Sequence, residues 1–276
     1  MSGYAELLNR HLTTYKASRL GVDEPGTFRH KGVDIEYGHI LPAQLKWLNL
    51  LEPFRAEVRG YLDAHRDVRP HKYFHHLNSS QAFALNLFYP FFATGASGKL
   101  LRALQMNGSV SGWRLEHVPD SQEGTNVDVA WHDDDGSWTY CEVKLSEQGF
   151  GTAKHDQEHE NKLAAIYRPV LGAYCPAELL EPGPFFANYQ ILRNVWLVAR
   201  DPSASLLFLL PRRNASLWGP LQSVIDALTP DLAGRVHIAA VEDVLSMLCS
   251  DDSLSRQLGA YAELLTEKYV PPASAS

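Results

Sequence analysis

Three residues in the middle of the chain have types and a spacing that suit metal-dependent hydrolysis: Asp128, Glu142 and Lys144. They occur in the segments NVDVAW and YCEVKLSE, on either side of the short polar turn HDDDGS. Side chains alternate between the two faces of a β-strand, so Glu142 and Lys144 share one face and Asp128 points away from its two valine neighbours. If the two segments pair as a hairpin, we expect all three side chains to converge on one spot.

Two carboxylates at one spot repel each other unless a cation lies between them. Hard divalent cations prefer oxygen ligands, and Mg²⁺ typically takes one or two carboxylates together with waters and substrate phosphate. Such a cation can activate water and stabilise the charge that develops on a phosphate. We therefore predict a site for Mg²⁺ or Mn²⁺ at Asp128 and Glu142, with Lys144 beside the phosphate or the attacking water.

The same residues also fit a hairpin with one solvated face, because exposed strand faces often carry Asp, Glu and Lys. The pattern Glu-x-Lys arises often by chance, and the preceding Asp128 raises its specificity only moderately. On these residues alone, a catalytic site and a solvated face are equally good interpretations.

The elements around the hairpin predict an α/β protein with a central mixed β-sheet flanked by helices. Apolar runs predict strands at residues 113–118, 126–131, 138–145, 195–199 and 206–210, and in the segment RVHIAAV. Helical patterns occur at residues 78–92, 98–106, 158–167 and 187–194, and in the segments LWGPLQSVIDAL and EDVLSMLC. In the first of these helices, Asn78 is the expected N-cap and Pro90 the expected end or kink.

The chain is expected to have three parts. Residues 1–70 look largely helical and predict an N-terminal helical extension or subdomain. Residues 71–270 form the predicted core domain, and residues 271–276 a disordered tail.

Composition restricts the class of protein. The net charge of -7 counts against a protein that coats nucleic acid non-specifically, although a cleft can still be locally basic. The three cysteines lie far apart and form no CxxC pair, so the sequence suggests neither a disulfide framework nor a zinc cage. No apolar run is long enough to span a membrane, and the start lacks the apolar core of a secretory signal, so we expect a cytoplasmic protein.

The segments NVDVAW and YCEVKLSEQGFG resemble the core of the PD-(D/E)XK nuclease superfamily, which has the restriction-endonuclease-like fold. The segments HLNSSQAFALNLFYPF and YQILRN are similar to a bacterial restriction-endonuclease branch of that superfamily, so the resemblance spans about residues 75–215. It implies Asp128 and Glu142 as metal ligands and Lys144 as the catalytic lysine. The sequence departs from the family name in one respect, since Val127 stands where a proline would precede Asp128.

Further candidates lie outside the hairpin. Gln81 could reach the site from the helix before the sheet, or it could simply cap that helix. Gln190 and Arg193 lie three residues apart on one helical face and could hold a scissile phosphate, or make ordinary hydrogen bonds at a helix end. Arg212 and Arg213 could contact the DNA backbone, or lie in a solvated turn.

Two histidines permit a different metal. His155 and His159 have a spacing that zinc ligands can use on a helix, but HDQEH lacks the His-Glu-x-x-His order of a metalloprotease, which favours surface histidines.

We therefore predict a Mg²⁺-dependent endonuclease that hydrolyses DNA phosphodiester bonds, such as a restriction endonuclease or a related defence or repair nuclease. The alternative is a binding module that keeps the nuclease-like fold for contact with nucleic acid or protein, without cleavage. DNA is the expected partner, a membrane is not, and a homodimer is left open.

Overall fold

The structure is a computed structural model that describes residues 3–272. Its described residues divide into two compact units, of which unit 1 comprises residues 3–109, 143–146 and 240–272, and unit 2 comprises residues 110–142 and 147–239. Most of the predicted tail, residues 273–276, lies outside the described part of the chain.

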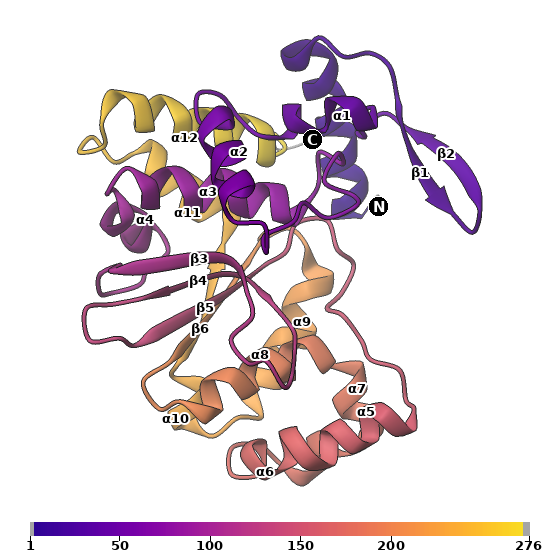
Figure 1. Ribbon diagram of the computed structural model, residues 1–276, viewed down its shortest axis with the longest axis vertical. Coiled ribbons are helices and arrows are strands. Elements are labelled where there is room, and N and C mark those ends of the chain that lie inside the picture. Colours follow the sequence, from indigo (N-terminus) through magenta and orange to yellow (C-terminus); the bar gives the residue numbers. More distant parts are fainter. Residues whose placement is uncertain (1–2, 273–276) are drawn as a thin grey trace. The chain divides into compact units, whose positions relative to one another are not determined.

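Unit 1 is mainly helical (Figure 1). Its elements are α1 (Tyr4–Leu20), β1 (Gly26–His30), β2 (Val33–Tyr37), the 3-10 helix η1 (Ala43–Asn49), α2 (Arg55–Ala64), α3 (Ser80–Ala93), α4 (Ser97–Ala103), α11 (Val241–Cys249) and α12 (Arg256–Tyr269). The C-terminal helix α12 packs against α1, α3 and α11, so the two ends of the chain belong to the same unit.

The expectation of a largely helical N-terminal region misses a hairpin. Strands β1 and β2 pair antiparallel, with His30 opposite Val33, and they extend away from the helices of unit 1 (Figure 1). The two turn residues, Lys31 and Gly32, have φ values of 48° and 84°. Positive φ at both central residues is the geometry of a tight hairpin turn. Lysine is uncommon at the first of these positions, so the sequence gives no strong signal for the turn.

Helix α3 is buried along most of its length, as an apolar helix must be. Its N-cap is Ser79, not the predicted Asn78, because the Ser79 hydroxyl accepts a hydrogen bond from the backbone N–H of Ala82. Pro90 does not end the helix, which continues to Ala93. The hydroxyl of Thr94 donates to the carbonyl of Pro90 and satisfies one of the acceptors at this end.

A buried polar cluster joins three segments of unit 1. The fully buried Lys268 of α12 donates from Nζ to the carbonyl oxygen of Asn49 at 2.5 Å and to its Oδ1 at 2.7 Å. Asn86 of α3 donates to the same carbonyl at 3.0 Å and to the hydroxyl of Tyr269 at 2.7 Å. Burial lowers the pKa of Lys268 well below its ordinary value.

Unit 2 contains the sheet. Its elements are β3 (Gly112–His117), β4 (Val127–His132), β5 (Trp138–Val143), α5 (Gln157–Lys162), the π-turn η2 (Leu163–Tyr167), α6 (Arg168–Leu171), the 3-10 helix η3 (Ala177–Leu180), α7 (Pro182–Ala187), α8 (Tyr189–Arg200), β6 (Ser205–Leu210), α9 (Ala215–Asp226), α10 (Pro230–Ala233) and β7 (Val236–Ala240).

The five strands are ordered β3-β4-β5-β6-β7. Both β3–β4 and β4–β5 pair antiparallel, and the predicted hairpin is therefore confirmed. The start of β6 bonds to the residue just before β7, from Leu206 N to Arg235 O, so these two strands run in the same direction. The predicted α/β fold with a central mixed β-sheet flanked by helices is confirmed.

Helix α8 packs on the sheet and supplies much of the core of unit 2. Val195 and Val198 are fully buried in the same cluster as Ala130, Tyr140 and Phe208 of the strands. The predicted strand at 195–199 is therefore wrong, because these residues continue α8 to Arg200. A short apolar run that is buried on all sides has the same appearance in a helix and in a strand.

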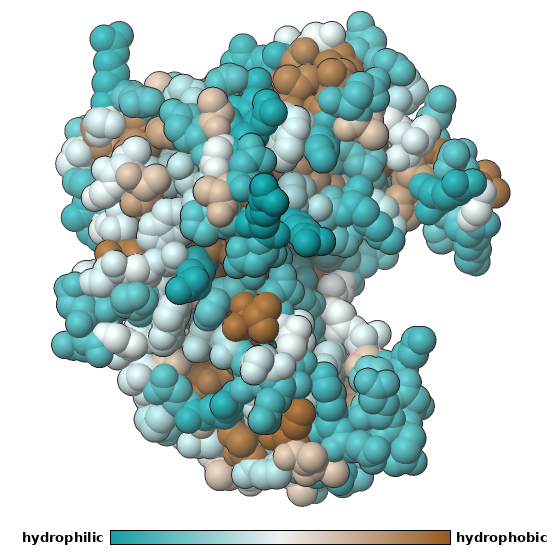
Figure 2. Space-filling view, in the orientation of Figure 1, coloured by the Kyte–Doolittle hydropathy of each residue, from teal (hydrophilic) through white to brown (hydrophobic). Residues whose placement is uncertain are grey.

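No helix of the described residues is long and apolar enough to cross a membrane. The face seen in Figure 2 is mostly hydrophilic, and its hydrophobic areas are small and separate. One of them lies on the β1–β2 hairpin, where Val33 is 63% exposed and Ile35 37% exposed.

Candidate active site

The register of the hairpin brings Asp128 level with Glu142. Val129 pairs with Cys141 and Ala130 pairs with Tyr140, so one further step along the same ladder sets Asp128 opposite Glu142. Residues directly opposite in an antiparallel pair point to the same face, with Cβ atoms about 4.5–5.5 Å apart. This face is the one that carries Ala130 and Tyr140 into the core of unit 2.

Cys141 lies beside both carboxylates, next to Glu142 in β5 and paired with Val129 in β4. Burial raises the pKa of its thiol well above the ordinary value, and the charges of Asp128 and Glu142 raise it further. The thiol is fully buried and strongly disfavoured as a thiolate, so Cys141 is a core residue and not a nucleophile.

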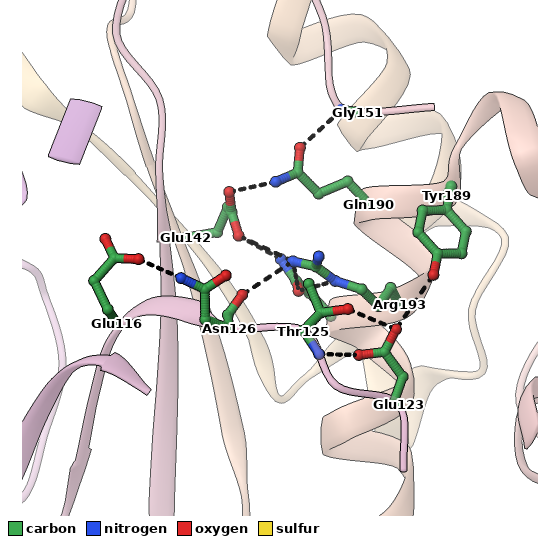
Figure 3. A network of polar contacts seen from close by, with 10 residues as sticks. Glu116, Glu123, Thr125, Asn126, Glu142, Gly151, Tyr189, Gln190 and Arg193 are labelled. Atoms are coloured by element: carbon green, nitrogen blue, oxygen red, sulfur yellow. Dashed lines mark hydrogen bonds and ion pairs between the residues drawn. The ribbon is translucent and has the colours of Figure 1, made fainter. Parts of the chain in front are cut away.

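Glu142 is held by three side chains of α8 (Figure 3). Gln190 donates from Nε2 to Oε1 at 2.6 Å, and Asn194 donates from Nδ2 to Oε2 at 2.9 Å. The Nη2 of Arg193 lies 3.6 Å from Oε2. The Glu142 side chain is only 4% exposed, and a carboxylate buried to this extent requires such partners.

Arg193 is itself fixed. Its Nε and Nη2 donate to Oδ1 of Asn194 at 3.1 and 2.9 Å, and Nη2 also donates to the carbonyl of Asn126 at 3.4 Å. Asn194 therefore bridges the guanidinium and the carboxylate. The result is a buried ion pair with an oriented guanidinium, in which neither charge is left without compensation.

Gln190 also connects the carboxylate to the segment after β5. Its Oε1 accepts a hydrogen bond from the backbone N–H of Gly151 at 2.7 Å, while its Nε2 donates to Glu142. A Cβ atom at position 151 would lie 3.2 Å from that Oε1, so glycine permits the close approach. Gly151, in the segment that follows the hairpin, thus fixes the side-chain amide of Gln190, and this amide in turn orients the Glu142 carboxylate.

A second buried carboxylate supports the start of α8. Glu123 is 5% exposed and accepts from the N–H and hydroxyl of Thr125, from Tyr167 OH at 2.7 Å and from Tyr189 OH at 3.2 Å. Burial acts to raise the pKa of Glu123, but the hydrogen bonds from Thr125 and Tyr167 outweigh it and leave the pKa lowered. Glu123 therefore anchors Tyr189, the residue next to Gln190.

Glu116 reaches the same level of the sheet from β3. It lies between the pairs Leu115–Val129 and His117–Val127, beside Asp128 in the register. Its φ of 51° is unusual for a residue in a strand, and its carboxylate accepts a hydrogen bond from the Nδ2 of Asn126 (Figure 3). Glu116, Asp128 and Glu142 thus form a row across three adjacent strands.

Lys144 follows Glu142 by two residues and lies one residue beyond the end of β5, which is shorter than the predicted strand 138–145. Its side chain is largely buried, with 8% exposed.

The predicted nucleic-acid-binding residues are placed as follows. Gln81, in the first turn of α3, accepts from the N–H of His71 at 2.7 Å and donates to the carbonyl of Arg69 at 3.0 Å, so it fixes a loop of unit 1. Arg212 and Arg213 are exposed in the turn between β6 and α9. Arg193 is buried against Glu142, as described above.

The spacing of the two histidines does not create a zinc site. His155 pairs with Glu160 at 2.7 Å, and His159 pairs with Asp156 at 2.6 Å. Among residues 3–272, no group of three or more His, Cys, Asp and Glu side chains is arranged to hold a metal ion.

A scan against protein-family models matches residues 9–270 to REase-ARP, described as a restriction endonuclease associating with ARP. The match covers nearly the whole chain. The chain belongs to the REase-ARP family. No curated protein matches the chain, and no solved structure does. The resemblance to restriction endonucleases is confirmed at the level of this family.

In this REase-ARP chain, the oxygen donors of Asp128 and Glu142 are of a type that suits Mg²⁺ or Mn²⁺ better than Zn²⁺. Asp128 and Glu142 offer only oxygen ligands, and Mg²⁺ can bind through one or two carboxylates when waters and substrate complete the shell. A structural zinc site would need about four protein ligands, commonly from His and Cys.

Two residues that support the candidate site were not singled out in the sequence, Asn194 and Glu123. Asn194 follows Gln190 by four residues, so the helical spacing already sets both amides on one face of α8. Glu123 lies in an irregular segment, where neither strand nor helix periodicity indicates which way a side chain points.

Proposed function

We propose that the chain is a metal-dependent nuclease of the PD-(D/E)XK type that hydrolyses phosphodiester bonds of DNA. The proposal is carried by one observation: in a restriction-endonuclease family member, the hairpin register sets Asp128 opposite Glu142, and α8 orients both oxygens of Glu142. A hairpin face that was merely solvated would not surround its glutamate with two amides and a guanidinium.

In this proposal, Asp128 and Glu142 hold Mg²⁺ or Mn²⁺, which when bound supplies a Lewis acid for the phosphate and for the attacking water. Gln190 and Asn194 keep the Glu142 carboxylate in one orientation. The proposed role of Lys144 is to offset negative charge on the phosphate as the bond to the leaving oxygen breaks.

Arg193 has a different proposed role from the one suggested by its sequence position. Its guanidinium is engaged with Glu142 and Asn194, so it neutralises the buried carboxylate and does not reach out to a phosphate. A buried carboxylate loses its hydration, and Arg193 supplies a counter-charge beside it.

The experiment is a cleavage assay on plasmid DNA with Mg²⁺ or Mn²⁺, comparing the wild type, Glu142→Gln and Glu147→Gln. Glu147 is the matched control, because it is the next acidic residue along the chain after Glu142 and the same Glu-to-Gln change can be made there. We expect cleavage by the wild type and the control, and none by Glu142→Gln or in the presence of EDTA. Cleavage by Glu142→Gln at the wild-type rate would contradict the proposal.

A binding module without cleavage is the second candidate. It is favoured by the Arg193–Glu142 ion pair, which gives Glu142 a structural explanation, and by the net charge of -7. In that case Mn²⁺ would not bind at Glu142, and a calorimetric titration would give the same result for the wild type and for Glu142→Gln.

A further inference from the structure

Unit 1 contains a basic pocket that the proposed active site does not use. It has a volume of about 510 Å³ and lies between η1, the end of α2 and the loop that follows α2. Lys46, Trp47, Arg66 and Arg69 line it, with Asp63 as the single acidic residue. A volume of this size suits a ligand such as a nucleotide.

The charge of this pocket is opposite to that of the whole chain. Its lining has three basic side chains and one acidic side chain, whereas the chain carries a net charge of -7. Within residues 3–272, none of Lys46, Arg66 and Arg69 forms an ion pair with an acidic side chain. Their charges therefore remain available to an anion.

The pocket also presents an ordered aromatic ring. Trp47 is half-buried, and the Phe74 ring packs edge-on against it at a centroid distance of 5.7 Å. The Nζ of Lys46 lies 4.9 Å from the Trp47 ring, and the guanidinium carbon of Arg59 lies 5.0 Å from it. A tryptophan surrounded by cations can contact a base or sugar while the cations contact phosphate.

Gln81 holds one wall of the pocket in place. Its amide donates to the carbonyl of Arg69 and accepts from the N–H of His71, which ties the loop backbone to the first turn of α3. The Nε of Arg69 donates in turn to the carbonyl of Arg66 at 3.3 Å. The two arginines are therefore carried by a fixed backbone, which reduces the entropy lost on binding.

We propose that this pocket binds a nucleic-acid strand, with Arg66, Arg69 and Lys46 on its phosphates and Trp47 against a base or sugar. The identity of the partner as nucleic acid rests on the proposed function, whereas the affinity of the pocket for phosphate rests on its own residues. The pocket gives an acidic protein a local basic surface, and it gives the N-terminal region a role in holding DNA.

The test is binding of a fluorescein-labelled single-stranded oligonucleotide by anisotropy in EDTA, where no metal-dependent cleavage occurs. The double variant Arg66→Gln, Arg69→Gln should bind about tenfold more weakly, and its salt dependence should lose about 1.4 units of log–log slope. The control is Lys31→Gln, Arg256→Gln, which removes the same charge from exposed positions outside the pocket. If both double variants lost the same amount of oligonucleotide affinity, the effect would come from the overall charge of the protein and not from the pocket, and the proposal would be overturned.

A second comparison tests the aromatic contact. Trp47→Leu should weaken oligonucleotide binding by about tenfold, and Trp47→Phe should retain most of the affinity, because a ring still faces the base. Melting curves accompany both variants, since Trp47 packs against Phe74. Wild-type affinity in a folded Trp47→Leu protein would exclude the contact.

The source of the phosphate is tested with a labelled nucleoside triphosphate. If only the triphosphate binds, and its binding depends on Arg66 and Arg69, the pocket is a site for free nucleotide and the proposal is wrong. Failure of the proposed function is a separate result: the wild type would not cleave plasmid DNA, or Glu142→Gln would cleave it at the wild-type rate, while oligonucleotide binding in EDTA stayed intact.

Discussion

The guanidinium of Arg193 lies 3.6 Å from Oε2 of Glu142, and the two side chains are only 8% and 4% exposed. Glu142 is thus a buried carboxylate whose charge is compensated by the protein itself. A divalent cation at Glu142 would bind close to the positive charge of Arg193, which should weaken its binding.

Arg193→Gln should tighten Mn²⁺ binding by roughly tenfold, because it removes a like charge beside the proposed site. Without metal, the same substitution should lower the free energy of unfolding by about 3–5 kcal/mol, because it leaves Glu142 buried without its counter-charge. Calorimetric titration and thermal melting measure the two effects, and Mn²⁺ should raise the melting temperature of the variant more than that of the wild type.

Arg200→Gln is the matched control on the same helix, since Arg200 pairs with Asp120 and its side chain is 41% exposed. It should leave Mn²⁺ affinity unchanged and alter stability by less than about 1 kcal/mol. Unchanged or weaker Mn²⁺ binding by Arg193→Gln would show that Arg193 does not oppose the metal.

Gln190→Ala should lower both Mn²⁺ affinity and the cleavage rate by about 10- to 100-fold. The reason is that Gln190 orients a proposed ligand, and outer partners of metal ligands typically carry effects of that size. Gln222→Ala is the control, because Gln222 lies exposed on α9 and bonds only to Asp226 in the described structure. If Gln190→Ala and Gln222→Ala cleaved DNA at the same rate, Gln190 would have no role in orienting a metal ligand.

Glu123→Gln should lower the free energy of unfolding by about 2 kcal/mol at neutral pH, because hydrogen bonds to a buried carboxylate are charge-assisted. The pKa of Glu123 is lowered in the folded state, so its stabilising effect is present above the unfolded pKa and is lost as the pH falls through the folded pKa. The stability gap between the wild type and the variant should therefore narrow below about pH 4.5. Chemical denaturation at several pH values measures it, and a gap that stays constant would contradict the assignment.

His39→Gln should flatten the loss of stability in mild acid. Burial, together with the charge of Lys16, lowers the pKa of His39 to about 4. Between about pH 6.5 and pH 4, His39 is therefore protonated in the unfolded chain but neutral in the folded chain. As the pH falls through this range, the free energy of unfolding of the wild type decreases by about 3 kcal/mol because of His39. Tyr37→Phe, at the neighbouring ring, is the control and should keep the wild-type slope.

The β4–β5 hairpin could be predicted because it depends on local sequence. Alternation in VDVAW and YCEVK sets the faces, and the turn contains Gly136, whose φ of 81° suits glycine. Given two strands and a short turn, the opposition of Asp128 and Glu142 follows from the pairing register alone.

The surroundings of Glu142 could not be predicted in the same way. Arg193 and Glu142 are about fifty residues apart in sequence, and their pairing depends on how α8 packs on the sheet. Residues 195–199 have the pattern of a strand for a different reason: burial on all sides removes the periodicity that separates helix from strand. The β1–β2 hairpin has no strong turn signal in the sequence, because Lys31 occupies a position usually taken by Asn, Asp or Gly.

Lys144 tests the central claim most directly, because it is proposed to hold no metal and to act only on the reacting phosphate. The measurement is the single-turnover rate of DNA cleavage by Lys144→Ala with saturating Mn²⁺, alongside calorimetric Mn²⁺ binding. We predict a rate about 100- to 1000-fold below that of the wild type, with Mn²⁺ binding retained. Cleavage by Lys144→Ala at the wild-type rate would contradict the assignment of this hairpin as the nuclease active site.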